Sequence, residues 1–472
     1  MRHQAARRLF LKRSLALAAL AANGLPLGME VARAAGAVSL PNRVLVNVML
    51  NGGPDMRHLF MPPWSDTVGS YGREFWRARA SAQTVGDTQS ALAQRWADAY
   101  LPVADGALEF GILREAGWLH AMWNAGKVAL VCGVESDPSR DHDLATRVRE
   151  TGNRQIDKFT FGSGWGGRLA LAAGGNAVAL TTSPRRFAFG PDPARPGNLT
   201  AVDNRRLIPA ANMREIALAE PDPGSDFYSM NDRLKRGLAN YYAARRVSEP
   251  RTSVYAQFFD HERKLRELGG VVDARLGATP VPAELEALFD DTRGIGYDLA
   301  LQTRNLYDAL LCNDILAMRV ASMDYNVWDS HNNQADEFAT NTLALFGTQG
   351  ALATLWGLLD DAVRANLVLV IGGEFGRQLA SNGGGGTNHG EGTTMIVIGD
   401  GVAGGVYGTM FPQEEIARLR QDSAEIIGLN GIDHVFGRVA DWVVPGAKAQ
   451  VFPNFASALL EAGLDLGGMM SA

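Results

Sequence analysis

Two short apolar runs, Leu367–Ile371 and Thr394–Ile398, enclose a polar loop that contains four consecutive glycines. Runs this short and this continuous predict buried parallel strands rather than helices or half-exposed strands. In open α/β sheets, ligand-binding residues follow the carboxyl ends of such strands. This segment therefore predicts both a parallel sheet and the edge of that sheet at which a site lies.

Similar runs recur along the chain, and helical patterns alternate with them. The further predicted strands are Arg43–Leu50, Lys127–Val134, Asn176–Thr181 and Arg319–Asn326. Helical patterns cover Trp118–Ala125, Asp298–Met318, much of Asp336–Ala365, and short pieces of Pro412–Leu466. This alternation predicts an α/β protein with a mostly parallel sheet. Between Phe187 and Pro282 prolines and charges increase, which predicts an inserted, mainly helical cap.

The amino-terminal residues form a pattern of their own. Residues 7–12 read RRLFLK, a twin-arginine signal; an apolar stretch follows from Leu15 to Ala22, and residues 32–34 offer an A-x-A cleavage site. The pattern predicts a signal peptide over 1–34 and a mature domain over 35–472, exported through the twin-arginine translocase to the periplasm or beyond. The apolar stretch is too short to span a membrane. The alternative interpretation is a basic amphipathic helix that belongs to the fold.

The charge balance argues against nucleic acid as a partner. The full chain carries a net charge of -6, which becomes -11 without residues 1–34, since these hold six basic side chains and one acidic side chain. An acidic chain is poorly suited to bind nucleic acid. Cys132 and Cys312 are the only cysteines and both lie in apolar contexts. Two buried free thiols and a disulfide are both compatible with this pattern.

Two strand ends carry residue types that bind metals. Asp329 and His331 follow the predicted strand Arg319–Asn326, and in extended chain residues two apart point to the same side. Divalent metals take such oxygen and nitrogen ligands, although a loop that caps the next helix gives the same pattern. Glu374 directly follows a buried strand. Three roles are compatible with this position: a metal ligand, a general acid or base, or the ion-pair partner of Arg377.

Other candidates lie in loops of the same kind. His389 follows the four glycines, which we interpret as a flexible spacer that delivers this side chain toward Glu374 and the Asp329/His331 pair; a lone histidine is more often an ordinary hydrogen-bonded group. Asp55 follows the first strand, and this position is compatible with a metal ligand and with an ordinary turn residue. His142 starts a helix after the second strand, a place that suits anions, while Ser139 and Asp141 are ordinary N-cap residues.

Several sequence motifs are absent from the chain. It contains no G-x-S-x-G, no G-x-x-x-x-G-K-[ST], no H-E-x-x-H and no C-x-x-C. A serine esterase of the α/β-hydrolase type, a P-loop nucleotidase and a zincin protease are therefore not supported.

An ordered set of motifs resembles one known family. The leader, GGPD, SRDH, GSGWGGRL, WDSHNNQ, GEFGR and GTNHGEG occur in this order. Together they resemble the exported bacterial family called domain of unknown function 1501, which is grouped with the alkaline phosphatase and sulfatase-like clan. The resemblance implies a three-layer α/β/α sandwich with a metal site at the carboxyl ends of the strands. It covers most of the mature chain.

The resemblance also implies roles for individual residues. The implied ligands of one or two divalent ions (Zn, Mg, Ca or Mn) are Asp55, Asp329, His331, Glu374 and His389. The implied activity is hydrolysis of phosphate or sulfate esters, in an anionic small molecule or polymer. His142 or Ser139 would assist catalysis, and Arg377 would steady the charged group.

Three positions depart from the family's pattern. Phe375 stands where the clan has a histidine, Asp141 stands where relatives have serine, and Asn388 replaces an aspartate. These departures support an alternative hypothesis, a non-catalytic envelope protein that binds a ligand or partner on a degenerate hydrolase scaffold.

Overall fold

The computed structural model divides the chain into two units, Met1–Ser39 and Leu40–Ala472, and only the second contains described residues. It describes residues 42–137, 139–154, 156–157, 162–181, 183–195, 197–215, 230–249, 267–290, 292, 294–419, 421, 423–453 and 459–471. The predicted signal peptide, residues 1–34, lies outside the described residues. Parts of the predicted cap, 216–229 and 250–266, also lie outside them.

A largely parallel sheet forms the centre of the second unit. Its strands are β1 (Val44–Asn51), β5 (Val128–Glu135), β6 (Asn176–Ala179), β7 (Leu207–Pro209), β8 (Met318–Asn326), β9 (Leu367–Gly372), β12 (Thr393–Ile398), β13 (Gly405–Tyr407) and β14 (Asn430–Gly431). The strand order is β13-β5-β12-β9-β1-β8-β6-β7, and β14 also pairs with β5. The predicted α/β class with a mostly parallel sheet is therefore confirmed.

One strand of this sheet runs against the rest. The apolar run Thr394–Ile398 was expected to be a parallel strand, but β12 pairs antiparallel with both β5 and β9. The predicted parallel direction of this strand was wrong, because an apolar run of this kind indicates that a strand is buried and does not indicate its direction. As a result, the loop between β9 and β12 leaves and rejoins the sheet at the same edge.

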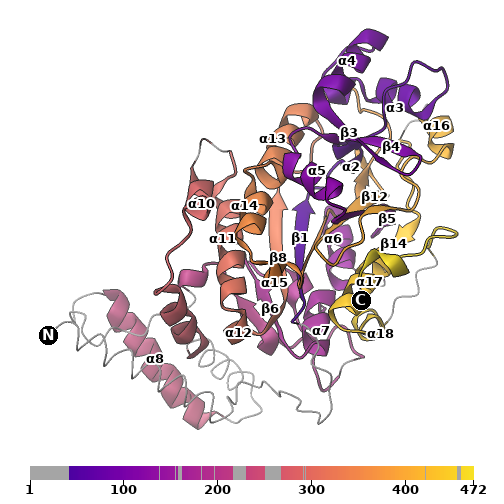
Figure 1. Cartoon of the computed structure of the whole chain (residues 1–472). Helices are drawn as coiled ribbons and strands as arrows, with labels where there is room; N and C mark the ends of the chain where they lie inside the picture. Colours follow the sequence, from indigo (N-terminus) through magenta and orange to yellow (C-terminus); the bar gives the residue numbers. More distant parts are fainter. Residues whose placement is uncertain are drawn as a thin grey trace. The chain divides into compact units, whose positions relative to one another are not determined.

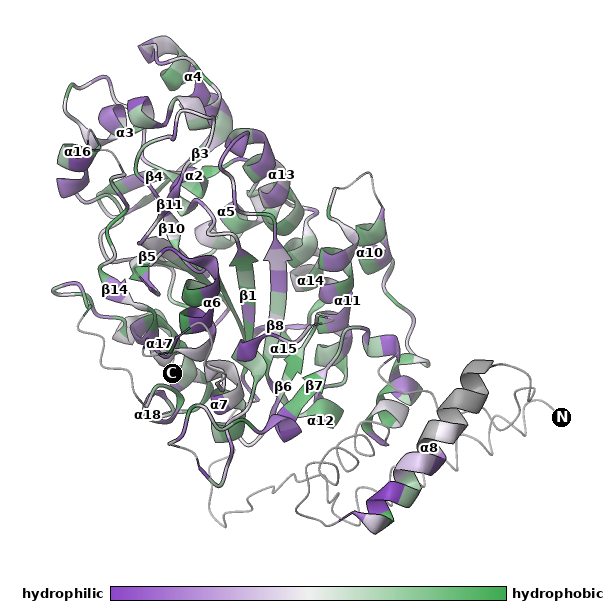
Figure 2. Ribbon diagram, turned by 180° about the vertical axis from the view of Figure 1, so that it is seen from behind, coloured by the Kyte–Doolittle hydropathy of each residue, from purple (hydrophilic) through white to green (hydrophobic). Residues whose placement is uncertain are grey.

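Helices cover both faces of the sheet (Figure 1). Val44, Val46 and Val48 of β1 pack into one core, with helices α5 (Gly117–Asn124), α11 (Tyr297–Leu311), α13 (Gln334–Phe346) and α14 (Ala351–Leu358). Leu45 faces the second core, with helices α7 (Trp165–Ala172), α17 (Ile432–Val443) and α18 (Lys448–Val451). The alternation along β1 thus separates two apolar cores, and the sheet is the middle of three layers. Figure 2 shows β1 as a hydrophobic strand between them.

Smaller elements complete the unit. A separate three-stranded sheet contains β2 (Phe60–Met61), β4 (Leu108–Leu113) and β3 (Tyr100–Asp105). The stretch expected to form the cap contributes helix α8 (Met230–Ser248) and also the edge strand β7. Among the described residues, no helix has the length and apolarity needed to cross a membrane.

Some element boundaries differ from the predicted ones. The helix expected over Asp298–Met318 ends at Leu311, and after a short helix, Asn313–Leu316, Ala317 adopts a left-handed conformation before β8 begins. Cys132 on β5 and Cys312 are both buried free thiols.

Candidate functional site

Loops at the carboxyl ends of the central parallel strands meet at one edge of the sheet. The loop after β1 starts at Gly52, the loop after β5 leads into helix α6 (His142–Thr151), and Asp329 follows β8. Beyond β9, the two-stranded ribbon of β10 (Gly376–Arg377) and β11 (His389–Gly390) crosses this edge. Because β5, β9, β1 and β8 lie close together in the sheet, segments far apart in sequence come together here.

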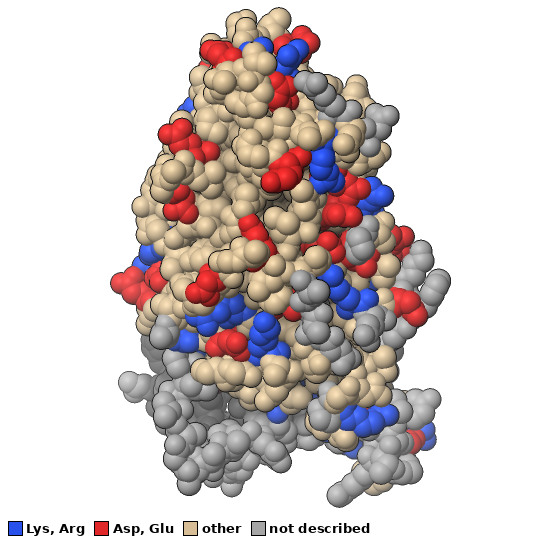
Figure 3. All heavy atoms as spheres, turned by 90° about the vertical axis from the view of Figure 1, so that its right-hand side faces the viewer, with Lys and Arg blue, Asp and Glu red and all other residues tan. Residues whose placement is uncertain are grey.

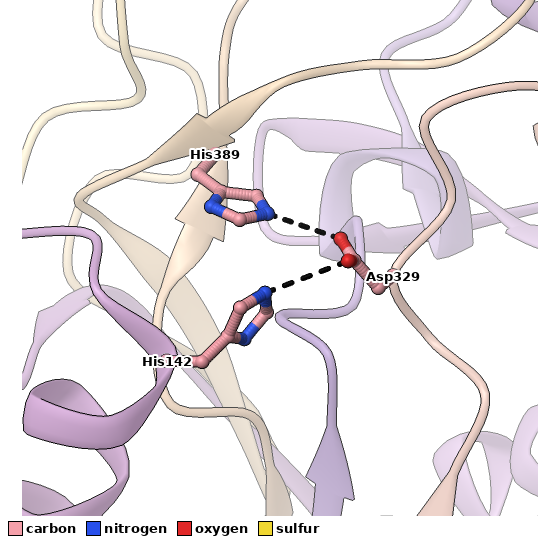
Figure 4. A group of neighbouring side chains, drawn as sticks. All are labelled: His142, Asp329 and His389. Atoms are coloured by element: carbon pink, nitrogen blue, oxygen red, sulfur yellow. Dashed lines mark hydrogen bonds and ion pairs between the residues drawn. The ribbon is translucent and has the colours of Figure 1, made fainter.

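Three histidines and one aspartate converge within this group of loops. His389 Nε2 lies 3.0 Å from Asp329 Oδ1, and His142 Nε2 lies 3.5 Å from Asp329 Oδ2 (Figure 4). His331 Nε2 lies 3.1 Å from Asp329 Oδ1 and 3.0 Å from His389 Nε2. His142, Asp329 and His389 can together offer a metal ion one ligand atom each. We refer to these four residues, His331 included, as the metal-type cluster.

Each histidine of the cluster is also held from its other ring nitrogen. His142 Nδ1 contacts Glu374 Oε1 at 2.6 Å, and His389 Nδ1 lies 3.2 Å from the carbonyl oxygen of Arg140. His331 Nδ1 lies 3.3 Å from Asn388 Oδ1. All three partners are acceptors, so each Nδ1 carries the proton in the neutral ring and each Nε2 has a free lone pair. Metal-binding histidines are held by such outer partners.

The spacing of these atoms fits a divalent cation. Two ligands about 2.1 Å from a cation and roughly 90–110° apart are separated by about 3.0–3.4 Å. The separations among Asp329 Oδ1, His331 Nε2 and His389 Nε2 are 3.0, 3.0 and 3.1 Å. Two imidazole lone pairs at such a distance repel each other unless a proton or a cation lies between them.

Glu374 orients His142 and is itself fully engaged. Its carboxylate is 1% exposed and accepts hydrogen bonds from the backbone N–H of Gly52 at 3.0 Å and of Gly53 at 3.1 Å. Both glycines have positive φ, and a Cβ on Gly52 would lie 2.4 Å from the backbone nitrogen of Asp329. The glycines after β1 thus allow the backbone to approach the site closely and to wrap the carboxylate.

Arg377, expected to steady a charged substrate group, lies fully buried beneath Asp329. Nη2 donates to Asp329 Oδ1 at 2.7 Å, and Nε and Nη1 donate to the carbonyl oxygens of Gly53 and Thr387. Burial alone would raise the pKa of Asp329, but the hydrogen bond and charge of Arg377, with His389, lower it to about 2. Arg377 therefore keeps Asp329 ionised and braces the loops.

The pKa shifts of the histidines follow their surroundings. The hydrogen bond to Glu374 raises the pKa of His142, whereas burial lowers the pKa of His389. Phe375 is fully buried, and its ring centre lies 4.7 Å from that of His142 and 4.6 Å from that of His389. The residue that departs from the family pattern thus packs against two cluster rings and fixes their planes.

Two of the predicted site residues lie apart from the cluster. Asp55 is fully buried, forms an ion pair with Arg79 and accepts a hydrogen bond from Gln334 Nε2 at 2.8 Å. Burial opposes its ionisation, but Arg79 holds the pKa of Asp55 below its usual value. Ser139 is exposed, and its Oγ accepts a hydrogen bond from the backbone N–H of Asp141 at 3.3 Å.

The glycine run is more tightly held than a flexible spacer. Asn382 Oδ1 accepts hydrogen bonds from the backbone N–H of Gly384 at 2.8 Å and of Gly386 at 3.3 Å. A Cβ on Gly386 would lie 2.3 Å from the carbonyl carbon of His331. Glycine is therefore required here for close packing against the loop that carries His331.

A pocket of about 340 Å³ adjoins the cluster and contains residues that the sequence patterns did not single out. It extends from His142 and Glu374 to three arginines, Arg147, Arg185 and Arg186. Helix α6 lines it with one polar stripe: His142, Asp143, Thr146, Arg147 and Glu150. Asp143, Thr146 and Arg147 follow His142 by one, four and five residues, which places them on one face of a helix. The sequence therefore contains the pattern of this polar face.

The pocket is lined by acidic as well as basic side chains, since Asp143, Glu150 and Glu374 stand beside the three arginines. On the face drawn in Figure 3, acidic and basic side chains are interspersed among neutral ones.

Comparison with known proteins identifies one family and no characterised relative. Residues 316–421 match a family model described as "Protein of unknown function (DUF1501)". The match includes Asp329, His331, Glu374 and His389, and supports the resemblance for this part of the chain. No curated protein matches the chain, and no solved structure does.

Proposed function

We propose that this protein is a metal-dependent hydrolase of anionic phosphate or sulfate esters, with an alkaline phosphatase-like architecture. The observation that carries the proposal is the convergence of three imidazole Nε2 atoms on one carboxylate, with each imidazole held from behind by an acceptor. The matched family has no described activity, so the proposal depends on this geometry.

The cluster would hold the cation through His142, His331, His389 and Asp329. Glu374 would be an orienting residue and not a ligand, because its oxygens already accept from His142 and two backbone N–H groups. A set rich in imidazole favours Zn²⁺ over Mg²⁺, Ca²⁺ or Mn²⁺, which are suited to oxygen ligands. A bound cation of this kind supplies Lewis acidity and activates water.

The surrounding residues would prepare the cluster for this chemistry. Arg377 keeps Asp329 ionised, so that the carboxylate remains a ligand at neutral pH. Phe375 restricts rotation of two imidazoles and excludes water from one side of them. Because Ser139 lies exposed outside the cluster, water rather than this hydroxyl would attack the ester.

Metal analysis of the purified mature chain tests the proposal directly. We expect about one equivalent of a divalent metal, and hydrolysis of 4-nitrophenyl phosphate or 4-nitrophenyl sulfate that EDTA abolishes and added metal restores. His389→Ala should lose both metal and activity. His120→Ala, on α5 and hydrogen-bonded to Asn124 outside the cluster, is the matched control and should lose neither. A metal-free protein whose properties do not change in His389→Ala would overturn the proposal.

A second candidate function is binding without catalysis. The exposed position of Ser139 favours it, since no serine of the predicted site reaches the cluster. In that case the protein would retain its metal yet leave both ester types intact, and loss of metal would abolish ligand binding instead of turnover.

We also propose that the protein is exported through the twin-arginine translocase, with residues 1–34 removed. The support is the order of three sequence signals, the RRLFLK pattern, the apolar stretch and the A-x-A site. Replacing Arg7 and Arg8 by lysine should retain the protein in the cytoplasm at its full length. Normal processing and export of that variant would contradict the assignment.

A further inference from the structure

The pocket beside the metal-type cluster adjoins a second, larger pocket. The second pocket has a volume of about 740 Å³, and Glu150, Arg185 and Arg186 line both pockets. The shared residues place the two pockets side by side, as an elongated ligand that occupies both would require. We name the two together the arginine groove, with the cluster at one end.

Three carboxylates, Asp143, Glu150 and Glu374, line the groove near the cluster, and the arginines beside them differ in how far they are paired. Arg185 is committed to carboxylates, with Asp324 Oδ2 at 2.8 Å and Glu150 Oε1 at 3.6 Å. Arg147 is different: within the described part of the chain, its Nη1 is shielded from solvent and has no hydrogen-bond partner. A buried guanidinium N–H without an acceptor is costly, so an acceptor on a ligand would be favourable here.

Arg186 lines the same pocket as Arg147 and is affected by its positive charge. Burial, followed by the charge of Arg147, lowers the pKa of Arg186. Glu150 opposes this shift, and all three side chains line the same pocket, so an anion held by Arg147 would also meet the positive charge of Arg186. Each nitrogen of Arg377 already donates to protein oxygens, so Arg377 is not available to an anionic group on a ligand.

The far end of the groove has another chemistry. Tyr297 is 67% exposed and Val327 is 57% exposed, so large side chains that could cover a ligand stand open to solvent there. The carboxylate of Asp298 also lines this end, which disfavours further negative charge on a ligand. An aromatic or other uncharged organic group fits this combination.

We propose that the arginine groove binds an ester with one anionic head and a large uncharged organic group. Arg147 and Arg186 would hold the phosphate or sulfate head beside the cluster, and the organic group would lie against Tyr297 and Val327. This inference rests on the proposed function, because it takes the cluster as the place where the ester reacts.

Binding of unreactive analogues tests the groove without requiring turnover. The probes are methylphosphonate, (2-naphthylmethyl)phosphonate and the two corresponding sulfonates, titrated calorimetrically into the metal-loaded mature protein. The naphthyl compounds should bind more tightly than the methyl compounds by about tenfold or more. The head group that binds more tightly, phosphonate or sulfonate, identifies the ester type.

Two variants then separate the ends of the groove. Arg147→Ala should weaken both the small and the large probe by about 10- to 100-fold, and Arg147→Lys should restore part of the loss. Tyr297→Ala should weaken only the naphthyl probe, by about three- to tenfold. Arg205→Ala, which removes an exposed arginine paired with Asp203 outside the groove, is the matched control.

The outcomes distinguish this inference from the proposed function. Equal affinity for the methyl and naphthyl probes in the wild-type protein would overturn the groove, whether or not any variant folds. An unchanged dissociation constant in Arg147→Ala would also overturn it, even in a protein that hydrolyses esters. The predicted binding pattern in a protein that hydrolyses nothing would support the groove and refute the hydrolase.

Discussion

Replacing Glu374 by glutamine removes one charge and keeps the size of a buried side chain. In the wild type, Oε1 accepts from His142 Nδ1 at 2.6 Å and from the N–H of Gly52 at 3.0 Å, and Oε2 accepts from the N–H of Gly53 at 3.1 Å. A glutamine has only one oxygen. Its amide N–H₂ must therefore face either the imidazole N–H or a backbone N–H, which places two donors against each other.

The size of the effect follows from these contacts. A buried donor left without its acceptor costs about 1–3 kcal/mol. Loss of the carboxylate behind a metal-binding histidine typically weakens metal affinity by about 10- to 100-fold, which is about 1.4–2.7 kcal/mol. We therefore expect Glu374→Gln to fold, to lose about 1–3 kcal/mol of unfolding free energy, and to bind Zn²⁺ about 10- to 100-fold more weakly.

Titration of metal-depleted protein with ZnCl₂ measures the affinity, and urea unfolding of the same samples measures the stability. The matched control is Glu415→Gln, since Glu415 is also a fully buried carboxylate and accepts from Arg57 and Tyr71 outside the cluster. The control should lose stability and keep its Zn²⁺ affinity. If Glu374→Gln binds Zn²⁺ as tightly as the wild type, the carboxylate does not orient a ligand and the assignment of His142 to the metal is refuted.

Three further predictions concern stability. Asp55→Asn should cost about 3–5 kcal/mol in urea unfolding, because it leaves the buried charge of Arg79 unpaired. Gly53→Ala should cost more than about 2 kcal/mol in thermal unfolding, because φ is +65° and the new Cβ would lie 2.2 Å from the ring of Phe375. Burial raises the pKa of Glu150 to about 7 from 4.5, so the folded state binds more protons than the unfolded state between these values. The stability that protonated Glu150 contributes is therefore present below pH 4.5 and is lost as the pH rises to about 7. Over this range the free energy of unfolding should fall by up to about 3 kcal/mol.

Matched comparisons separate each cause from a general effect. Asp361→Asn breaks an exposed ion pair and should change stability by less than about 1 kcal/mol. Gly106→Ala has a similar φ of +59° but no atom within 4 Å of the new Cβ, so it reports the backbone strain without the clash. Glu150→Gln should remove the pH-dependent loss; an identical pH profile in wild type and variant would contradict the assigned pKa. A mild effect of Asp55→Asn, equal to that of Asp361→Asn, would contradict the buried ion pair.

The sequence predicted the frame of the sheet well because continuous apolar runs are a strong signal of buried strands. The run Arg43–Leu50 became β1 at Val44–Asn51, within one residue at each end. The direction of β12 could not be predicted from its apolar run, since direction depends on how the chain connects at the sheet edge. The end of α11 at Leu311 was also missed, because the apolar pattern continues through the short helix that follows.

The site shows the same division between local and distant information. Asp329 and His331, which follow a strand, lie close to His389 in the structure, and their role as metal ligands stays a prediction. Asp55 had the same local pattern, yet it pairs with Arg79, a partner that nothing in its own loop identifies. The stripe of α6 that includes Arg147 could not be assigned to a pocket from the sequence, because a polar stripe at helical spacing is also the pattern of an ordinary solvent-exposed helix face.

The reversed direction of β12 has a consequence for how the site forms during folding. The segment that carries Glu374 and His389 starts and ends at neighbouring strands, so it closes a short loop at a modest entropic cost. His142 and Asp329 arrive on strands whose pairing requires far longer loops to close, and long-range contacts form late. His389, with Glu374, thus belongs to a local hairpin-like half of the site, and the other half, with His142, Asp329 and His331, awaits completion of the sheet. A cation that needs both halves binds only the completed fold, so its concentration would directly set the stability of the whole domain.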